Sequence, residues 1–290
     1  MCKPIIKKIQ AKNILSKTNL PVGDYAVNPY VGCTHACKYC YASFMKKFTG
    51  HLENWGEFLD VKFWSEIKNP KKFSGKEIFI SSVTDPYNPQ EEIFCRTREF
   101  LKQMQGSGAK ITIQTKSDLI LRDIDLLKNF SDIRVGFSIN TLDETFKNVM
   151  DKAVSIERRI SAMQKLHDAG IRTTCFISPI FPEITDVEKI IECVKDFCNL
   201  IWLENLNLRG NFKATILNFI AKNYPRHLPI YKKIYLQGDK TYWEELNKKI
   251  EKFTAQKNLL YVRNNDDIKQ PFDAPPVVVN FFYHEQIKKQ

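Results

Sequence analysis

Short apolar runs rich in β-branched and aromatic residues alternate along the chain with stretches whose apolar residues recur every three or four positions. This alternation predicts buried strands separated by amphipathic helices. The predicted strands are residues 77–83, 110–115, 133–139, 172–177 and 200–203. The clearest helical spacings are Ile120/Ile124/Leu127 and Ile156/Ile160/Met163/Leu166, the second followed by the stop signal Ala169-Gly170.

The spacing of the strands predicts how they are connected. Their starts lie roughly thirty residues apart, which is the length of one β-α unit. A parallel sheet with right-handed crossovers is therefore the expected topology. Residues 25–30 (YAVNPY) can add a short first strand. The expected fold class is α/β.

Polar side chains follow several of these strands. Thr84 and Asp85 come after the first, Lys116 after the second, and Ser138 and Asn140 at the end of the third. Because ligands bind at the carboxyl ends of parallel strands in α/β folds, we expect these side chains to share one site. Ordinary turns also place such residues after strands, and for any single position that alternative stays open.

Composition and charge narrow the class of protein. The 290 residues are 43% hydrophobic and 27% charged, as expected for a folded globular protein. The formal net charge is +11, and the first fifty residues hold eight lysines against one acid, Asp24. This favours anionic partners such as nucleic acid, although solubility alone also accounts for it. The N-terminus lacks a signal-peptide core and no apolar run reaches membrane-spanning length, so we expect a cytoplasmic protein.

Three cysteines fall within eight residues of the stretch VGCTHACKYCYA, positions 31–42. A tetrahedral zinc site takes four protein ligands, and a complete iron–sulfur cubane takes four thiolates. Three thiols therefore leave one metal position open. His35 could fill it and form a Cys3His zinc site, which would indicate a binding module without catalysis.

The spacing C-x-x-x-C-x-x-C of Cys33, Cys37 and Cys40, with Tyr39 before the last cysteine, resembles the signature of the radical S-adenosylmethionine (SAM) superfamily. The resemblance implies that the three thiolates hold a [4Fe–4S] cluster whose open iron binds SAM. Reductive cleavage of SAM then gives methionine and a 5′-deoxyadenosyl radical that abstracts hydrogen from a substrate. The resemblance also implies a partial (β/α)6 barrel of the TIM type.

Further segments resemble the spore-photoproduct-lyase-like branch of this superfamily, often labelled DNA repair photolyase. They lie at residues 84–87 (TDPY), 115–117 (TKS), 137–140 (FSIN) and 178–180 (SPI). Within the branch, NPYVGCTHACKYCYASFMKKFTGH and WLENLNLRG are similar to protein B of the radical SAM mobile pair proteins, which occur as two-enzyme sets on mobile elements. The resemblance covers about residues 22–210.

Residue by residue, the resemblance implies SAM contacts at several of these positions. Tyr39 would contact the adenine, and Ser82 or Thr84, together with Asp85, would lie near the methionyl amino group. The implied contacts to the carboxylate or ribose are Lys116, Ser138 and Asn140.

Two departures from the branch bear on the reaction. Spore photoproduct lyase carries a hydrogen-returning cysteine in the segment that matches residues 81–85, which here reads SSVTD. The missing cysteine counts against thymine-dimer repair. Glu183 stands where relatives commonly have glycine, so the geometry of its loop is in question.

The remaining cysteines and histidines divide by pattern. Cys175 and Cys198 are expected in the core, and Cys193 lies at the edge of an apolar stripe. Cys95 is a candidate functional thiol, because we expect it opposite the apolar face of a helix. That face would be formed by Ile93, Phe94, Phe100, Leu101 and Met104. Four single histidines are expected at the surface or at helix ends: His51, His167, His227 and His284.

Beyond residue 210 the pattern changes. Residues 214–224 and 242–253 are expected helices, and residues 259–262 and 277–283 are expected extended segments. Aromatic and basic side chains in this part resemble a nucleic-acid surface, although a packed helix pair with a solvated face fits as well. They include Tyr231, Lys232, Lys233, Tyr235 and Trp243.

These observations give three expected segments and one expected activity. The segments are a basic N-terminal extension (1–21), a radical SAM core barrel (22–210) and a C-terminal α+β extension (211–290) that covers the open side of the barrel. The expected substrate is nucleic acid, with a peptide or partner protein and a small metabolite as alternatives. The resemblance also implies a reductant such as flavodoxin or ferredoxin, and a second radical SAM protein, as partners.

Overall fold

The computed structural model describes residues 3–18, 23–208, 210, 212–263 and 277–284. The chain divides into two compact units. Unit 1 holds residues 1–137 and 151–173, and unit 2 holds residues 138–150 and 174–290. The three segments expected from the sequence stay a prediction. Within the described ranges, none of the helices has the length and apolar character needed to cross a membrane.

The main sheet of unit 1 has the strand order β2, β3, β6, β7, β8. The last four pair in parallel, while β2 pairs with β3 antiparallel. Isoleucines alternate with polar residues along β7, so one set of side chains is buried in the core. The bounds are β2 Leu15–Lys17, β3 Tyr25–Val27, β6 Glu77–Ile80, β7 Lys110–Thr115 and β8 Ile133–Ser138.

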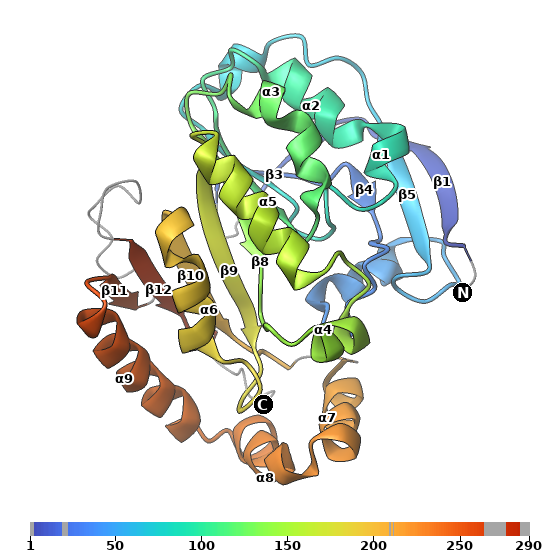
Figure 1. The fold of residues 1–290 in the computed structure, drawn as a ribbon. Helices are drawn as coiled ribbons and strands as arrows, with labels where there is room; N and C mark the ends of the chain where they lie inside the picture. Colours follow the sequence, from blue (N-terminus) through green and yellow to red (C-terminus); the bar gives the residue numbers. More distant parts are fainter. Residues whose placement is uncertain (1–2, 19–22, 209, 211, 264–276, 285–290) are drawn as a thin grey trace. The chain divides into compact units, whose positions relative to one another are not determined.

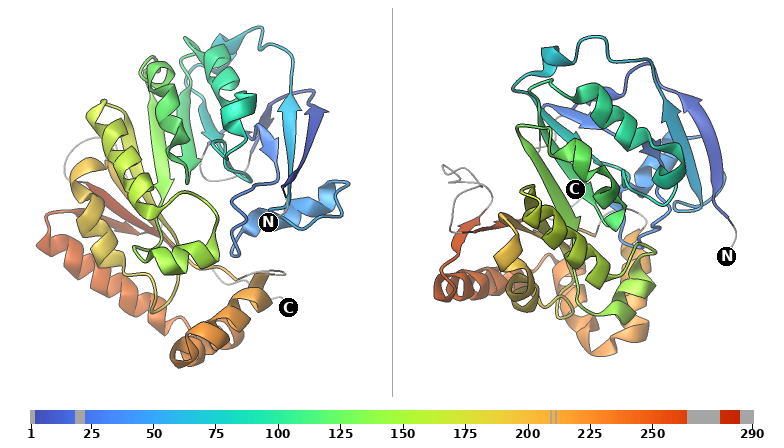
Figure 2. Two further views of the ribbon diagram at one scale, coloured as in Figure 1. Left: turned by 45° about the vertical axis from the view of Figure 1, so that its right-hand side comes forward. Right: turned by 45° about the horizontal axis from the view of Figure 1, so that its top comes forward.

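A second, smaller sheet of unit 1 was not expected from the sequence. In it β5 (Phe58–Phe63) pairs in parallel with β1 (Ile5–Gln10) and antiparallel with β4 (Tyr30–Val31), and Figure 2 shows β1 and β5 side by side. The short strand expected at residues 25–30 is confirmed as β3, but it ends at Val27 instead of continuing to Tyr30. The chain turns at Asn28-Pro29 and places β3 and β4 in different sheets, because proline cannot continue a ladder.

The helices of unit 1 confirm the strongest helical pattern. Helix α5 (Ile156–Asp168) begins where Ser155 Oγ accepts from Arg158 N–H, and it ends before Gly170, whose φ is 80°. Figure 1 shows α2 and α3 side by side in the same unit. The other bounds are α1 Glu91–Phe94, α2 Arg96–Met104, α3 Ile124–Leu127, and the 3-10 helices η1 Tyr41–Phe48, η2 Pro70–Phe73 and η3 Asp118–Asp123.

The described residues of unit 2 form four parallel strands in the order β9, β10, β12, β11. Their bounds are β9 Arg172–Ile180, β10 Leu200–Asn205, β12 Val278–Phe282 and β11 Leu260–Arg263, and the first two residues of β9 belong to unit 1. The predicted C-terminal elements are confirmed within a few residues. Cys175 and Cys198 are buried, as expected. The helices are α4 Glu144–Met150, α6 Val187–Val194, η4 Lys195–Phe197, α7 Phe212–Asn223, η5 Pro225–His227, α8 Leu228–Lys232, the π-helix η6 Lys233–Gln237 and α9 Thr241–Gln256.

Candidate functional site

The three clustered cysteines lie on the loop between β4 and η1. Two tight turns shape it: Ala36 N–H donates to Cys33 O over 3.2 Å, and Cys40 N–H donates to Cys37 O over 3.1 Å. Ala36 has φ 48°, a left-handed conformation that residues with a β-carbon rarely adopt. Cys33 is buried, and Cys37 and Cys40 are half-buried. The loop therefore brings three thiols together on a short, tightly turned backbone.

Burial raises the pKa of all three thiols. For Cys33, the Asp85 carboxylate and the other two cysteines add to this effect. For Cys37, burial raises the pKa to about 12 even though the Lys116 ammonium opposes it. Burial also raises the pKa of Cys40. Because three adjacent thiolates repel one another, a bound cation is the group that would stabilise their charged form.

Residues 51–60 pack directly against the cysteine loop. A β-carbon on Gly56, whose φ is 100°, would lie 2.5 Å from Ala36 Cβ. A β-carbon on Gly32 would lie 2.5 Å from the carbonyl oxygen of Phe58. Real β-carbons do not approach other atoms so closely, so both contacts require glycine. The loop is thus held from outside by a segment that the cysteine motif does not include.

His51 fixes this packing segment and was wrongly expected at the surface. Its Nε2 lies 2.8 Å from Asp60 Oδ1 and its Nδ1 lies 2.9 Å from Glu53 Oε2, while its ring stacks on Phe58 at 4.0 Å between centroids. The same segment carries Trp55, whose buried Nε1 has no hydrogen-bond partner in the described part of the chain. Burial raises the pKa of the nearby Cys40 thiol, and the Trp55 indole is among the groups that oppose this rise.

Asp85 lies in the segment that follows β6, five residues after the end of the strand at Ile80, and is buried. Its Oδ1 accepts from Tyr87 N–H and Thr115 Oγ1 over 2.9 and 2.7 Å, and its Oδ2 accepts from Lys116 N–H over 2.7 Å. His35 Nε2 lies 3.1 Å from Oδ2. Burial alone would raise the pKa of this carboxyl, but His35, Thr115 and Lys116 outweigh burial and lower the pKa to about 2. Asp85 is therefore an anion that joins the ends of β6 and β7 to the cysteine loop.

The segment after β6 also contacts both ends of the cysteine loop. Thr84 Oγ1 donates to the carbonyl oxygen of Gly32 over 2.6 Å. Ser82 Oγ accepts from Asn28 Nδ2 over 2.8 Å, and its carbonyl oxygen accepts from the Tyr41 hydroxyl. The sequence predicted Ser82 and Thr84 as SAM contacts, and the structure places both beside the cysteine loop.

Tyr39 and Lys116 meet on the same side of unit 1. The Lys116 ammonium lies 5.9 Å from the centre of the Tyr39 ring. The Tyr39 hydroxyl donates to Asp151 over 3.3 Å, and Asp151 pairs with Arg159 at 2.8 Å. Since Arg159 and Asp151 side chains are at most 1% exposed, this ion pair is a fixed anchor for the loop. The backbone N–H of Lys152 adds a 2.7 Å hydrogen bond to His35 O.

The last two predicted SAM contacts lie in unit 2. Ser138 and Asn140 are both buried. The Asn140 carbonyl accepts from Thr185 Oγ1 over 2.8 Å, while Asn140 Nδ2 is buried with no partner among the described residues. A buried amide N–H that lacks a partner is a donor available to a ligand.

Cys95 does not stand on a helix face, so that expectation is wrong. It separates α1 from α2 and adopts φ 51°, because the chain changes direction between them. Ile93 is 72% exposed and does not share the buried face of Phe100. The Cys95 sulfur lies 3.6 Å from Arg122 Nη1.

The geometry bears on the choice between zinc and a cluster. A single zinc ion needs its ligands within about 2.3 Å, gathered around one point. Within the described ranges, no group of three His, Cys, Asp or Glu side chains is arranged to hold one ion. A cubane instead spreads its thiolate ligands over the corners of a larger body, and three thiols of one loop are the donor set that it takes when one iron is left open.

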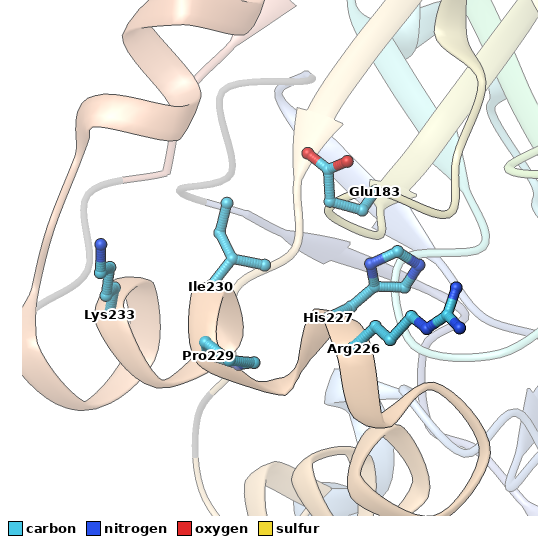
Figure 3. Close-up of a pocket in the computed structure, with 6 residues that line it drawn as sticks. All are labelled: Glu183, Arg226, His227, Pro229, Ile230 and Lys233. Atoms are coloured by element: carbon cyan, nitrogen blue, oxygen red, sulfur yellow. The ribbon is translucent and has the colours of Figure 1, made fainter.

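A separate pocket of about 340 Å³ lies in unit 2 (Figure 3). The loop residue Glu183 has φ 61°, a left-handed backbone conformation that glycine adopts more readily than glutamate, which accounts for the glycine common in relatives. The Glu183 N–H donates to the Tyr242 hydroxyl over 3.1 Å. Arg226 and His227 adjoin one another, and Lys233 stands beyond Ile230. The pocket is lined by Glu183, Arg226, His227, Pro229, Ile230 and Lys233.

The three aromatic residues of the predicted nucleic-acid surface are in the core of unit 2. Tyr231, Tyr235 and Trp243 are 0%, 6% and 2% exposed, so they cannot stack on bases. The structure therefore confirms the alternative of packed helices with a solvated face. Of the five residues predicted to form a nucleic-acid surface, only Lys232 and Lys233 are exposed.

Comparison with known proteins identifies the class. The family model "Radical SAM superfamily" matches residues 27–196, and the chain belongs to this family. It is a radical SAM enzyme of the α/β class, with the partial TIM-type barrel of the superfamily and with a [4Fe–4S] cluster and SAM as cofactors.

Individual relatives show how far the similarity extends. An uncharacterized protein of Methanocaldococcus jannaschii is 42% identical over 228 residues, covering 78% of this chain and 86% of the relative. A "Radical SAM Nalpha-GlyT isomerase" of Pseudomonas phage M6 is 26% identical, over 56% of this chain and 34% of the isomerase. A solved spore photoproduct lyase variant with bound AdoMet and dinucleoside spore photoproduct superposes with TM-score 0.56 at 14% identity, over 76% of this chain and 66% of the lyase. The lyase comparison supports the fold alone.

Proposed function

We propose that Cys33, Cys37 and Cys40 hold the [4Fe–4S] cluster and that SAM binds beside them, at the carboxyl ends of the unit 1 strands. When bound, these cofactors supply reductive cleavage of SAM and a 5′-deoxyadenosyl radical for hydrogen abstraction. The observation that carries the proposal is the position of the three thiols, on a loop whose two ends are bonded to the segment after β6. That position is where parallel α/β folds bind ligands.

The surrounding residues would orient the cofactors. The Trp55 indole N–H would donate to the Cys40 thiolate or an adjacent sulfide, because it is a buried donor beside that thiol. Tyr39 and the Lys116 ammonium would face the adenine and the carboxylate of SAM, and Asp85 would hold Lys116 and His35 in place. Ser82 and Thr84 complete the proposed SAM contacts of unit 1, and the contacts predicted at Ser138 and Asn140 of unit 2 stay a prediction.

For the substrate we favour nucleic acid. The net charge of +11 favours a polyanion. The Arg226, His227 and Lys233 side chains of the unit 2 pocket could receive phosphate groups. A peptide or partner protein, or a small metabolite, are the alternatives.

The proposed compartment and partner proteins follow from the thiols and from the reductive chemistry of the cluster. Clustered thiols need a reducing compartment, so we place the protein in the cytoplasm. A flavodoxin or ferredoxin would supply the electron, and a second radical SAM protein would complete a pair.

The test is anaerobic reconstitution with iron and sulfide, followed by dithionite, SAM and an assay for 5′-deoxyadenosine. We expect product from the wild type and from Cys193→Ala, which removes an exposed cysteine outside the loop. The Cys33/Cys37/Cys40 triple alanine variant should make none. A colourless wild type that binds one zinc ion and makes no deoxyadenosine would refute the proposal. Salt-sensitive binding of labelled oligonucleotides tests the substrate class, because phosphate contacts release counterions.

A further inference from the structure

Helix η1 carries an exposed aromatic face immediately after the third cluster cysteine. Tyr41, Phe44 and Phe48 are 60%, 48% and 68% exposed. Tyr41 and Phe44 lie one turn apart on this 3-10 helix and so share a side, and the Phe48 ring contacts the Phe44 ring. We call these three side chains the η1 aromatic face. Large apolar groups gathered at the surface mark sites of interaction.

The face is ordered rather than loose. The Tyr41 hydroxyl donates to the carbonyl oxygen of Ser82. Phe44 and Phe48 meet edge to face with 6.4 Å between ring centres, and the Lys47 ammonium lies 4.8 Å from the Phe48 ring centre. Side chains that are already fixed lose little entropy when a partner covers them, which favours a small interface.

The sequence around the face carries charge of a single sign. Between Asp24 and Glu53 the sequence contains no acidic residue, whereas Lys38, Lys46 and Lys47 fall in this stretch. Lys46 Nζ donates to the carbonyl oxygen of Leu52 over 3.0 Å, so its charge is held at the edge of η1. An apolar centre with a basic rim is complementary to an acidic protein surface that has an apolar centre.

The position of the face selects the kind of partner. Cys40 is the residue that precedes η1, so a protein seated on the face would lie next to a cluster ligand. We propose that the η1 aromatic face is the docking surface of an acidic one-electron carrier protein that reduces the cluster. One electron passes from the carrier's reduced flavin or iron–sulfur centre to the cluster, the carrier is oxidised by one electron, and no covalent bond changes. Small, transient interfaces steered by charge are typical of electron-transfer partners. This inference rests on the proposed function.

The test compares two reductants of the same reconstituted protein. Loss of the visible absorption of the cluster is followed by stopped flow, with reduced flavodoxin as the protein donor and with dithionite as the small donor. The Lys47→Glu/Phe48→Ser variant should be reduced by flavodoxin at least about tenfold more slowly, within the range that electrostatic steering supplies. Reduction by dithionite should be unchanged. Ile93→Ser, which removes a 72% exposed apolar side chain on α1, is the matched control and should behave as wild type.

Three results would overturn the proposal. Equal slowing with both reductants would show that the substitutions act on the cluster itself. An unchanged rate with flavodoxin, together with loss of binding to a labelled single-stranded oligonucleotide, would assign the face to nucleic acid. The same unchanged rate with a shift in oligomeric state would assign it to a second copy of the chain. A wild type that takes up no cluster refutes the proposed function, and the docking proposal falls with it.

Discussion

Replacing Gly56 by alanine should destabilise the cysteine loop. Position 56 has φ 100°, and forcing a residue with a β-carbon into a left-handed conformation costs about 1–2 kcal/mol. The new β-carbon would also lie 2.5 Å from Ala36 Cβ, and overpacking of this kind costs about 1–3 kcal/mol more. We therefore expect Gly56→Ala to lower the free energy of unfolding by about 2–5 kcal/mol.

Gly75 provides the control for the backbone part of this effect. It has φ 70°, but a β-carbon there meets nothing within 4 Å. Gly75→Ala should therefore lose only the conformational part, about 1–2 kcal/mol. Urea unfolding of the apoprotein under reducing conditions measures both variants. Their difference contains the contact with Ala36 together with the greater strain of a β-carbon at φ 100° than at φ 70°. Iron content after reconstitution should fall for Gly56→Ala and not for Gly75→Ala, since only the former displaces the loop between Cys33 and Cys37.

A second substitution tests whether Ala36 is the group that clashes. Ala36 has φ 48°, a conformation that glycine adopts without steric cost, so Ala36→Gly alone should change the free energy of unfolding little. In the double variant the nearest remaining atom is the α-carbon of residue 36, at 2.9 Å from the new β-carbon, so recovery should be partial. Equal loss of stability in Gly56→Ala and Gly75→Ala, or no coupling between positions 36 and 56, would refute the packing argument.

Three further predictions concern buried polar groups. Trp55→Phe should lower the reduction potential of the reconstituted cluster by about 20–60 mV, the one-electron equivalent of about 0.5–1.5 kcal/mol for a lost hydrogen bond; an unchanged EPR-monitored titration contradicts this. Arg159→Leu leaves the Asp151 carboxylate buried without its guanidinium and should cost about 3–5 kcal/mol in urea unfolding, whereas Arg158→Leu, at an exposed pair, should cost under about 1 kcal/mol. Because folding lowers the pKa of Asp85 from 3.8 to about 2, its contribution of about 2 kcal/mol is present above pH 4 and is lost as the pH falls towards 2. Asp85→Asn should remove that part of the acid dependence, and an identical acid profile argues against it.

The sequence predicted those parts of the fold that depend on local pattern. Strand β7 was predicted at its observed bounds, and α5 ends at the glycine that the sequence indicated. Such elements are set by alternation or by helical spacing within the element itself. The clustered cysteines and the polar strand ends of β6 and β7 were likewise visible, since a motif and a strand end are both local features.

Features that depend on distant partners were missed. The pairing of β1 with β5 joins segments about fifty residues apart, and the exposed strand β1 has no alternation to indicate it. His51 was expected at the surface, because nothing near it in sequence shows that Asp60 and Phe58 will enclose it. Tyr231 and Trp243 were ambiguous for the same reason, since an aromatic residue in a stretch that also contains lysines suits either a surface or a core.

The cysteine loop shows why a short motif does not by itself specify a site. Ala36, with a left-handed backbone, could relax in an isolated peptide. It is held by Gly56 on one side, by the Thr84 hydroxyl at Gly32, and by the bond from the Tyr39 hydroxyl to Asp151. Each of these contacts comes from a different part of unit 1, so the loop can be ordered only after the unit has folded. The entropy cost of ordering the three thiols would then be met during folding and not during metal binding. Substitutions at the supporting residues should therefore weaken cluster uptake without removing a ligand.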